Sequence, residues 1–289
     1  MRILALGDVV GRPGRQAVCD LLPGVVKQHA VDLVVANGEN IAGGSGITAN
    51  LFRKLRSYGV GCVTLGDHAF RKADILPVLD SSERIVRPAN LSRRAAGRTH
   101  VIVPVQANGR EVPVAVFALI GRLFIANMPG DNPFTVADRV FSELPAGVKC
   151  VVVDLHCEAT SEKMALGWHL AGRASLVFGT HTHIPTADAR LIHGGGSGGG
   201  GATAYVTDIG MCGPYDSVLG RRKEAVTSWM ADNVPAPFEV ATGDVRLCGV
   251  IADVDENTGR ARSVERFELS AGNADQAYDR DDRAGASDD

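Results

Sequence analysis

Short apolar runs alternate with longer segments of helical periodicity over the first third of the chain. Residues 2–6, 31–36 and 62–65 read RILAL, VDLVVA and CVTL, which is typical of strands buried on both faces. Between them, residues 15–29 and 48–58 repeat apolar side chains at three- or four-residue spacing, which predicts helices. This βαβ order indicates a parallel sheet whose strands are joined by helices.

Residues at the ends of these segments predict where the helices start and stop. Thr48 is suited to cap the second helix, because its hydroxyl can accept a hydrogen bond from a free amide of the first turn. Gly59 is suited to end that helix, since glycine readily takes the left-handed conformation. Pro23-Gly24 is expected to break or kink the first helix, because proline lacks the amide proton that a helix interior uses.

Strands outnumber helices in the rest of the chain. Asn108-Gly109 separates two apolar segments and predicts a hairpin, and Glu256-Asn257-Thr258-Gly259 predicts another near the C-terminus. Helices are expected at 135–144 and 161–170. Further strands are expected at 149–155, 174–180, 187–192 and 203–207. Without an internal repeat, this order predicts an α/β fold in which two sheets pack as a β-sandwich flanked by helices.

Length and composition favour one domain. The chain has 289 residues, 45% of them hydrophobic, which is enough for one large core over residues 1–270. Residues 271–289 contain six Asp and two Arg, so we expect an acidic, disordered tail. The run GGGSGGGG at 194–201 is too flexible to pack, so we expect an exposed connection between two strands and not a phosphate loop.

Other sequence features predict a soluble cytoplasmic protein without a membrane partner. No run of about 18 apolar residues occurs, and the N-terminus has no signal-peptide pattern. The six cysteines are dispersed and never form a CxxC pair, which indicates reduced, buried thiols. No basic block appears, so extended nucleic-acid binding is not indicated, whereas a small nucleotide is compatible with the composition.

Each of the first three predicted strands runs into side chains that bind metals. Asp8 follows the first strand, Glu39-Asn40 the second and Asp67-His68 the third. Taken alone, each has a structural explanation as a turn or cap residue. The carboxyl ends of parallel strands meet at one sheet edge, so the repetition favours a metal site. Glu39 could then bridge two ions while Asn40 offers an amide oxygen.

Three histidines follow later strands. His156 ends the strand at 149–155, and His181 and His183 follow the strand at 174–180. A lone histidine in this position is often a core residue, but two histidines separated by one residue point to the same side of an extended backbone. We therefore expect all three to face one metal cluster.

Other polar residues near these motifs have simpler explanations. Thr160-Ser161 with Glu162-Lys163 reads as a helix cap, and we assign Glu158 no role. Asp208 ends a strand, but the ligand set is sufficient without it. The remaining histidines are not expected to bind metal. We expect His29, His100 and His169 to be structural or exposed, and His193 lies away from strand ends.

The ordered segments GDVVG, NGEN, TLGDH, DLHCEATSEK and FGTHTHIPTAD together resemble a metallophosphoesterase. The resemblance extends from Met1 to about Leu269, and is strongest to the YmdB-like group, described as 2',3'-cyclic-nucleotide 2'-phosphodiesterases. It implies a two-sheet sandwich flanked by helices, in agreement with the hydrophobic pattern. It also implies two metal ions per chain, a small phosphate ester or cyclic nucleotide substrate, RNA ends as a further substrate class, and a homo-oligomer.

The resemblance implies two groups of ligands that share Glu39 as a bridge. The first group is Asp8, Glu39 and His183. The second group is Glu39, Asn40, Asp67, His156 and His181. His68 occupies the position that in the family donates a proton to the leaving oxygen.

Two positions depart from the pattern of the broad superfamily. Val10 stands where a histidine is usual, as expected for the YmdB-like branch, and Asp67 stands where an asparagine is usual. A set of imidazoles and carboxylates suits iron, manganese or zinc better than magnesium or calcium. The resemblance favours iron first and manganese next.

The reaction implied is hydrolysis of 2',3'-cyclic nucleotides to 3'-nucleotides by a metal-bridging hydroxide, with His68 as the acid. Two alternatives stay open. One is a broad phosphomonoesterase or phosphodiesterase. The other is a regulatory nucleotide- or RNA-binding protein on the same scaffold. The sequence alone does not distinguish them, nor does it assign roles to the glycine-rich run and the acidic tail.

Overall fold

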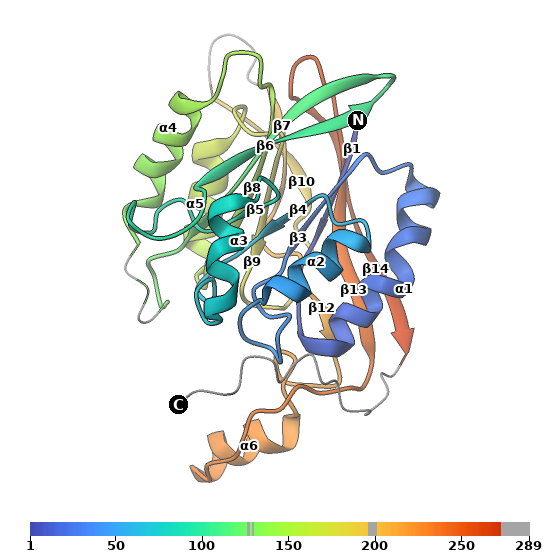
Figure 1. Cartoon of the computed structure of the whole chain (residues 1–289), viewed down its shortest axis with the longest axis vertical. Coiled ribbons are helices and arrows are strands. Elements are labelled where there is room, and N and C mark those ends of the chain that lie inside the picture. The colour runs from blue at the N-terminus through green and yellow to red at the C-terminus, as the bar shows by residue number, and fades with distance from the viewer. Residues whose placement is uncertain (126–127, 129, 196–200, 273–289) are drawn as a thin grey trace.

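The structure is a computed structural model that describes residues 1–125, 128, 130–195 and 201–272 (Figure 1). Two β-sheets lie face to face, and helices cover their outer faces (Figure 1). The predicted α/β sandwich is therefore confirmed.

The first sheet has eight strands in the order β2-β12-β13-β1-β3-β4-β5, with β14 also paired to β13. Strands β1, β3, β4 and β5 are parallel, so their carboxyl ends meet at one edge. The bounds are β1 Arg2–Leu6, β2 Asp8–Val9, β3 Leu33–Asn37, β4 Cys62–Thr64, β5 Ile85–Val86, β12 Met211–Pro214, β13 Val245–Val254 and β14 Ala261–Gly272.

The second sheet has six strands in the order β10-β11-β9-β8-β7-β6. Strands β7, β8, β9 and β11 are parallel, which gives this sheet its own set of carboxyl ends. The bounds are β6 His100–Ala107, β7 Arg110–Ile120, β8 Cys150–His156, β9 Leu176–Thr180, β10 Arg190–His193 and β11 Ala202–Val206.

Five helices pack on the outer faces of the sheets, three on the first and two on the second (Figure 1). A sixth, α6, lies at one end of the molecule, away from the two layers (Figure 1). The bounds are α1 Gly11–His29, α2 Ala49–Ser57, α3 Leu76–Ser81, α4 Pro133–Glu143, α5 Thr160–Leu170 and α6 Lys223–Asp232, with a 3₁₀ turn, η1, at Ala73–Ile75 before α3.

Adjacent residues of the central strands enter different cores, because strand side chains alternate between faces. Ile3 lies between the sheets, whereas Leu4 packs against α1 and α2. In the second sheet, Val152 faces the core between the sheets and Val153 the core beneath α4 and α5. Burial on both faces explains why these strands read as continuous apolar runs.

Most predicted local signals are confirmed. The Thr48 hydroxyl accepts a hydrogen bond from the Leu51 amide, and Gly59, just after α2, has a φ of +106°. Asn108-Gly109 joins the antiparallel pair β6 and β7. The turn at residues 256–259 joins β13 and β14, which also pair as a hairpin.

Of the break or kink predicted at Pro23-Gly24, the break is wrong, and the kink stays a prediction. Helix α1 runs through Pro23 from Gly11 to His29. Pro23 is exposed, so the carbonyl that loses its helical donor can bond to water, while the buried Leu22 and Val25 hold the helix against the sheet.

The predicted acidic tail lies outside the described residues from residue 273 onward, so its disorder stays a prediction. The single domain over residues 1–270 also stays a prediction. The glycine-rich run connects β10 to β11, two antiparallel neighbours, as expected, although residues 196–200 are outside the described part.

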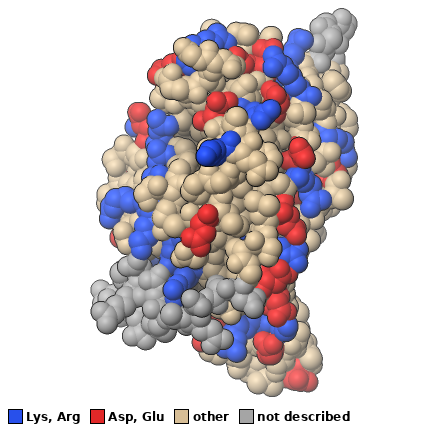
Figure 2. Space-filling view, turned by 90° about the vertical axis from the view of Figure 1, so that its right-hand side faces the viewer, with Lys and Arg blue, Asp and Glu red and all other residues tan. Residues whose placement is uncertain are grey.

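All six cysteines are free thiols, as expected, and five are buried, whereas Cys19 is half-buried. Among the described helices, none combines the length and apolarity needed to cross a membrane. Figure 2 shows basic and acidic side chains interspersed over the face that carries α1 and β14. Ion pairs such as Arg246–Glu268 and Arg262–Asp255 contribute to this mixed surface charge.

Candidate metal centre

The predicted ligands gather where the carboxyl ends of the two sheets meet. Asp8 starts β2, and the segments after β3 and β4 carry Glu39-Asn40 and Asp67-His68. His156 ends β8, and the segment after β9 carries His181 and His183. The first sheet therefore supplies the carboxylates and the second sheet supplies three of the imidazoles.

Four of these side chains form one compact group: Glu39, Asp67, His156 and His181. His156 Nε2 lies 2.9 Å from Asp67 Oδ1 and 3.1 Å from Glu39 Oε1. His181 Nδ1 lies 3.0 Å from His156 Nε2 and 3.3 Å from Asp67 Oδ1. Two ring nitrogens and two carboxylate oxygens thus converge on one point.

Asp8, Asn40 and His183 lie together beside this group. His183 Nε2 is 3.7 Å from Asp8 Oδ1 and 3.2 Å from the Asn40 amide nitrogen. The Asn40 amide oxygen faces His68 Nδ1 at 3.0 Å. The contacts of Asn40 are therefore with His183 and His68, and its place in the second ligand group stays a prediction.

The geometric reason predicted for the His181–His183 pair is wrong, although both rings face the centre. His181 has a φ of +89° and His183 a φ of +64°, so this segment is a turn in the left-handed region and not an extended strand. Positive φ costs energy in residues with a side chain. The two histidines reach the centre because hydrogen bonds with neighbouring elements hold this turn in place.

The hydrogen bonds of His156 determine which ring nitrogen faces the centre. Thr180 Oγ1 donates its single proton to Asp154 Oδ1 at 2.6 Å. It must therefore accept a hydrogen bond from His156 Nδ1, 2.9 Å away. His156 Nε2 is thus the ring nitrogen that faces Glu39 and Asp67, as a metal ligand requires.

The other two imidazoles have similar outer partners. His181 Nε2 lies 3.2 Å from Glu158 Oε2, which fixes the proton on Nε2 and leaves the Nδ1 lone pair for the centre. His183 Nδ1 lies 3.1 Å from the Leu219 carbonyl oxygen, which can only accept, so the lone pair is on Nε2. In each of the three rings, the nitrogen that faces the carboxylates is therefore the one that has no partner outside the centre.

His68 lies at the edge of the centre. Its amide donates to Glu39 Oε2 at 3.1 Å, and its Nε2 lies 3.6 Å from Asp67 Oδ2. Burial disfavours the charged ring, but the hydrogen bond to Glu39 and the charges of Glu39 and Asp67 raise the pKa of His68. These neighbours therefore favour the charged form of the His68 ring.

The carboxylates and imidazoles shift one another's pKa values. Burial alone would raise the pKa of Glu39, yet the charge of His156 and its hydrogen bond lower it to about 2. Burial likewise opposes ionisation of Asp67, whose pKa is lowered strongly by His156 and His181. Burial opposes protonation of His156, but Glu39 and Asp67 raise its pKa well above the ordinary value. The centre thus concentrates negative charge that a cation would balance.

The residues present fit a metal centre. Asp8 Oδ1 is buried and makes no hydrogen bond among the described residues. A buried carboxylate oxygen without a partner is costly, and a cation would supply that partner. Oxygen and imidazole nitrogen atoms in this mixture are typical ligands of first-row transition metals.

Comparison with known proteins agrees with this arrangement. The model of the YmdB-like protein family matches residues 4–267. The chain belongs to the YmdB-like family. A 2',3'-cyclic-nucleotide 2'-phosphodiesterase of Bacillus subtilis (strain 168) is 42% identical to this YmdB-like chain over 267 residues, covering 92% of the chain and 96% of the relative.

Solved structures show the same fold. A hypothetical protein of Thermus thermophilus matches with a TM-score of 0.83 and 36% identity, covering 93% of this YmdB-like chain and 99% of its own. A phosphatase of Mycoplasma pneumoniae matches with a TM-score of 0.84 and 30% identity, covering 94% of each chain. A 5'-nucleotidase of Candida albicans shares the fold at 9% identity, with a TM-score of 0.53, covering 93% of this chain and 51% of its own.

Lys163 and Asp208 are two buried charged residues of the YmdB-like chain that the sequence did not identify as parts of the centre. Lys163 is fully buried, and its ammonium donates to the Thr180 carbonyl at 2.8 Å and to Asp208 Oδ2 at 2.5 Å. Thr182 Oγ1, in the turn between His181 and His183, donates to the same carboxylate oxygen at 2.7 Å. The Lys163–Asp208 ion pair therefore stabilises the turn that carries His181 and His183.

A third missed residue is Asp154, which is buried between the sheets. It accepts hydrogen bonds from Thr64 Oγ1 at 2.5 Å and Asn37 Nδ2 at 3.2 Å in the first sheet, besides Thr180 in the second. Burial raises the pKa of Asp154 to about 6, against the charge of His156 and the hydroxyl bonds. A carboxylate inside the run VVVDL, two residues before His156, was the signal in the sequence.

The predicted cap at Thr160-Ser161 is wrong. Both residues lie within α5, whose N-cap is Ala159 and makes no side-chain hydrogen bond. Glu162 instead accepts hydrogen bonds from the amides of Arg122 and Leu123 in the loop after β7. The polar start of α5 thus orders a neighbouring loop.

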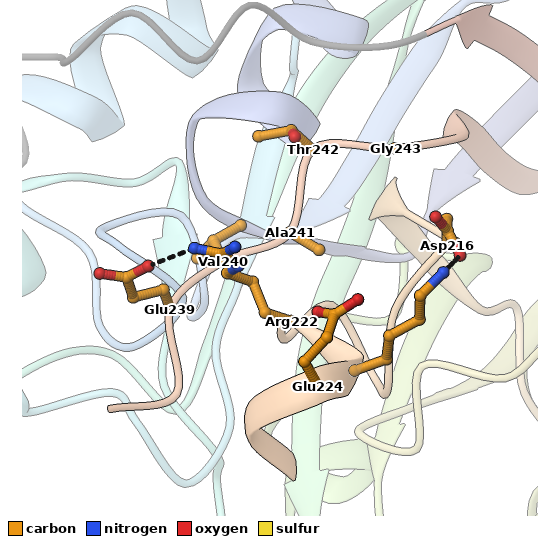
Figure 3. Close-up of a pocket in the computed structure, with 9 residues that line it drawn as sticks. Asp216, Arg222, Glu224, Glu239, Val240, Ala241, Thr242 and Gly243 are labelled. Carbon is orange, nitrogen blue, oxygen red and sulfur yellow. Dashed lines mark hydrogen bonds and ion pairs between the residues drawn. The ribbon is translucent and has the colours of Figure 1, made fainter. Parts of the chain in front are cut away.

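A separate hollow beside α6 does not share these residues (Figure 3). Lys223 pairs with Asp216, and Arg222 with Glu239 at 3.1 Å, as the dashed lines mark. Because these charges pair with each other, the hollow is a much weaker candidate for phosphate chemistry than the centre at the sheet edges.

Proposed function

We propose that this chain is a metal-dependent phosphodiesterase that hydrolyses 2',3'-cyclic nucleotides to 3'-nucleotides. The observation that carries the proposal is the convergence of Glu39, Asp67, His156 and His181 on one point, with the outer nitrogen of each imidazole engaged by a partner outside the centre. The substrate class is supported by the name of the relative from Bacillus subtilis, which is similar along nearly all of the chain.

Seven side chains would hold two metal ions, with Glu39 as the bridge. The proposed ligands are Asp8, Glu39, Asn40, Asp67, His156, His181 and His183. Bound cations would neutralise phosphate oxygens and lower the pKa of a water molecule, so that hydroxide is present near neutral pH. We favour iron, and manganese next, because imidazole and carboxylate ligands suit both.

His68 is the proposed proton donor. Its Nδ1 faces the amide oxygen of Asn40, so Nδ1 donates there and orients the ring. The Nε2 proton of the charged ring is then available for the departing 2' oxygen, which leaves a 3'-phosphate. The side chain is one-quarter exposed, at 25%, so a substrate oxygen can reach it.

Substitutions separate the proposed ligands from the proposed acid. Replacement His68→Ala should keep the metals but lower turnover by at least about 100-fold, the usual contribution of general acid catalysis. Replacements His181→Ala and Asp8→Asn should lose both metal and turnover. Elemental analysis and steady-state kinetics on the same preparations check this, and full activity of the His68 variant would remove its assigned role.

A broad phosphatase is the second candidate, favoured by the likeness to the Mycoplasma pneumoniae phosphatase. Turnover of 2',3'-cAMP, 3',5'-cAMP and p-nitrophenyl phosphate by one metal-loaded preparation distinguishes the two candidates. We expect the highest kcat/KM for 2',3'-cAMP and 3'-AMP as its product. Equal kcat/KM values for all three compounds would favour the broad phosphatase.

We further propose a cytoplasmic enzyme that self-associates and also accepts RNA ends bearing a cyclic phosphate. The six unpaired thiols suit a reducing compartment.

Around α6, Trp229, Met230 and Val234 expose apolar side chains that a second copy of the chain could cover. Light scattering coupled to size-exclusion chromatography measures the oligomeric state, and a monomer at all concentrations would contradict self-association.

A further inference from the structure

A hollow of about 410 Å³ lies between the end of β5, the start of β6 and helix α4. None of its lining residues is a proposed ligand of the metal centre. The lining contains four arginines and one histidine but a single carboxylate: Arg87, Arg93, Gly97, Arg98, Thr99, His100, Arg139 and Glu143.

Arg87 forms the fixed wall of this arginine hollow. Only 1% of Arg87 is exposed, and its five N–H groups donate to backbone carbonyls at 2.8–3.5 Å. Among the described residues, no carboxylate pairs with it. Its positive charge is therefore hydrogen-bonded but not neutralised. Burial, and then the charge of Arg139, lower the pKa of Arg87, as expected for two like charges held close together.

The other arginines compete for too few carboxylates. Arg93 and Arg139 approach the same oxygen of Glu143, at 4.0 Å and 3.8 Å. Within the described part of the chain, Arg98 pairs with Glu83 alone, at 3.6 Å, and both side chains are exposed. Such long contacts leave most guanidinium N–H groups available for another acceptor.

We propose that the arginine hollow binds phosphate groups, separately from the metal centre. A concave, positively charged lining concentrates anions, and guanidinium groups match phosphate oxygens with paired hydrogen bonds. No Phe, Tyr or Trp is among the described lining residues, so charged groups dominate the lining and favour phosphate over a nucleobase. Two sources have this chemistry: the sugar-phosphate backbone of an oligonucleotide, and free phosphate.

The loop that Arg87 organises also reaches the metal centre. Asn90 bonds to both the amide and the carbonyl of Ile120, each at 2.8 Å. Ile120 is paired with His156 in the parallel ladder between β7 and β8. The loop that lines the arginine hollow is therefore hydrogen-bonded to the strand beside His156. This connection suits two sites that contact different parts of one nucleotide chain.

The first arm of the test measures a 5'-labelled tetranucleotide with a 3'-phosphate by fluorescence anisotropy, on metal-loaded protein. Replacements Arg98→Gln and Arg139→Gln should each weaken binding about fivefold, the effect of one partly exposed charge contact. The control is Arg94→Gln, because Arg94 is an exposed neighbour that does not line the hollow. Thermal melting of each variant verifies folding.

The second arm measures the rise in Tm that inorganic phosphate causes in the same variants. A smaller rise in the Arg98 and Arg139 variants than in Arg94→Gln supports the site with free phosphate as a ligand. A loss confined to the tetranucleotide supports the site with a nucleotide chain as the ligand. If both probes bind all three variants equally, the proposal is overturned. Every variant keeps the metal centre, so these readouts do not depend on turnover.

Discussion

Gly66 is where a single side-chain atom would disturb the metal centre most directly. A Cβ built on Gly66 would lie 2.2 Å from ring atoms of His156, a distance that real contacts do not show. We therefore predict that Gly66→Ala displaces the imidazole, lowers the free energy of unfolding by about 1–3 kcal/mol and reduces bound metal. Denaturant unfolding and elemental analysis measure the two effects.

The matched control for this substitution is Gly24→Ala. Gly24 lies in helix α1, and a Cβ there would meet no atom within 4 Å. Because alanine favours a helix by about 0.8–1 kcal/mol over glycine, this variant should be as stable as the parent or more so. If Gly66→Ala retains as much metal as Gly24→Ala, the close approach to His156 does not constrain the centre.

Glu158 is predicted to orient His181 from outside the centre. Its Oε2 lies 3.2 Å from His181 Nε2, so it holds the proton on that nitrogen. Replacement Glu158→Ala should weaken metal binding about tenfold, at the low end for an outer hydrogen-bond partner because the glutamate is 48% exposed. Metal titration measures this affinity. Replacement Glu158→Gln, which keeps an acceptor oxygen, should restore most of it, and equal affinities in both variants would contradict the orienting role.

The strand-end residues were predictable from the sequence because parallel strands bring their carboxyl ends together whatever the sequence between them. This reasoning located Asp8, Glu39 and His156 without any contact information. It could not assign a partner to Glu158, because the Glu158–His181 contact depends on how the turn after β9 folds back. Nor could it show that Thr180 orients His156, since that depends on the register of β8 and β9.

At the scale of elements, the turn after β9 depends on the buried ion pair beneath it. Lys163 of α5 and Asp208 after β11 join three elements around a segment whose two histidines have positive φ. We predict that Lys163→Met lowers the free energy of unfolding by about 3–5 kcal/mol, because it leaves Asp208 buried without its partner. Metal affinity should fall as well, since the turn loses its support.

A double-mutant cycle tests the pair. In Lys163→Met combined with Asp208→Asn, the uncompensated charge is removed, so part of the lost stability should return. Metal affinity should remain low, because the carbonyl of Thr180 still lacks its donor. Additive losses of stability in the double variant would mean that Lys163 and Asp208 act independently.

The errors at this scale share one physical cause, namely that local propensity was overridden by packing. Pro23 has no amide proton, yet α1 continues because its buried face is held against the sheet. His181 and His183 follow a strand, yet leave the extended conformation under the contacts of Lys163 and Thr182. Sequence patterns report local preference, and long-range contacts of this kind are not visible in them.

The whole molecule is joined at the sheet edges through polar groups as well as through its apolar core. Asp154 of the second sheet bonds to Asn37 and Thr64 of the first. The proposed ligands follow the same division, with Asp8, Glu39 and Asp67 on the first sheet and the three strand-end imidazoles on the second. Bound metal would therefore cross-link the two sheets at their carboxyl ends.

Removal of metal should for this reason lower the stability of the whole sandwich. A ligand at about 100 times its Kd stabilises a fold by about 2.7 kcal/mol, which corresponds to roughly 4–5 °C in Tm for a protein of this size. We expect a drop of that size when chelator removes the metal, recovered by adding iron or manganese. Scanning calorimetry on samples of known metal content measures it. The control is Glu39→Gln, which lacks the proposed bridge and should melt at one temperature with or without chelator. An unchanged Tm in the parent after verified metal loss would show that the ligands do not join the sheets.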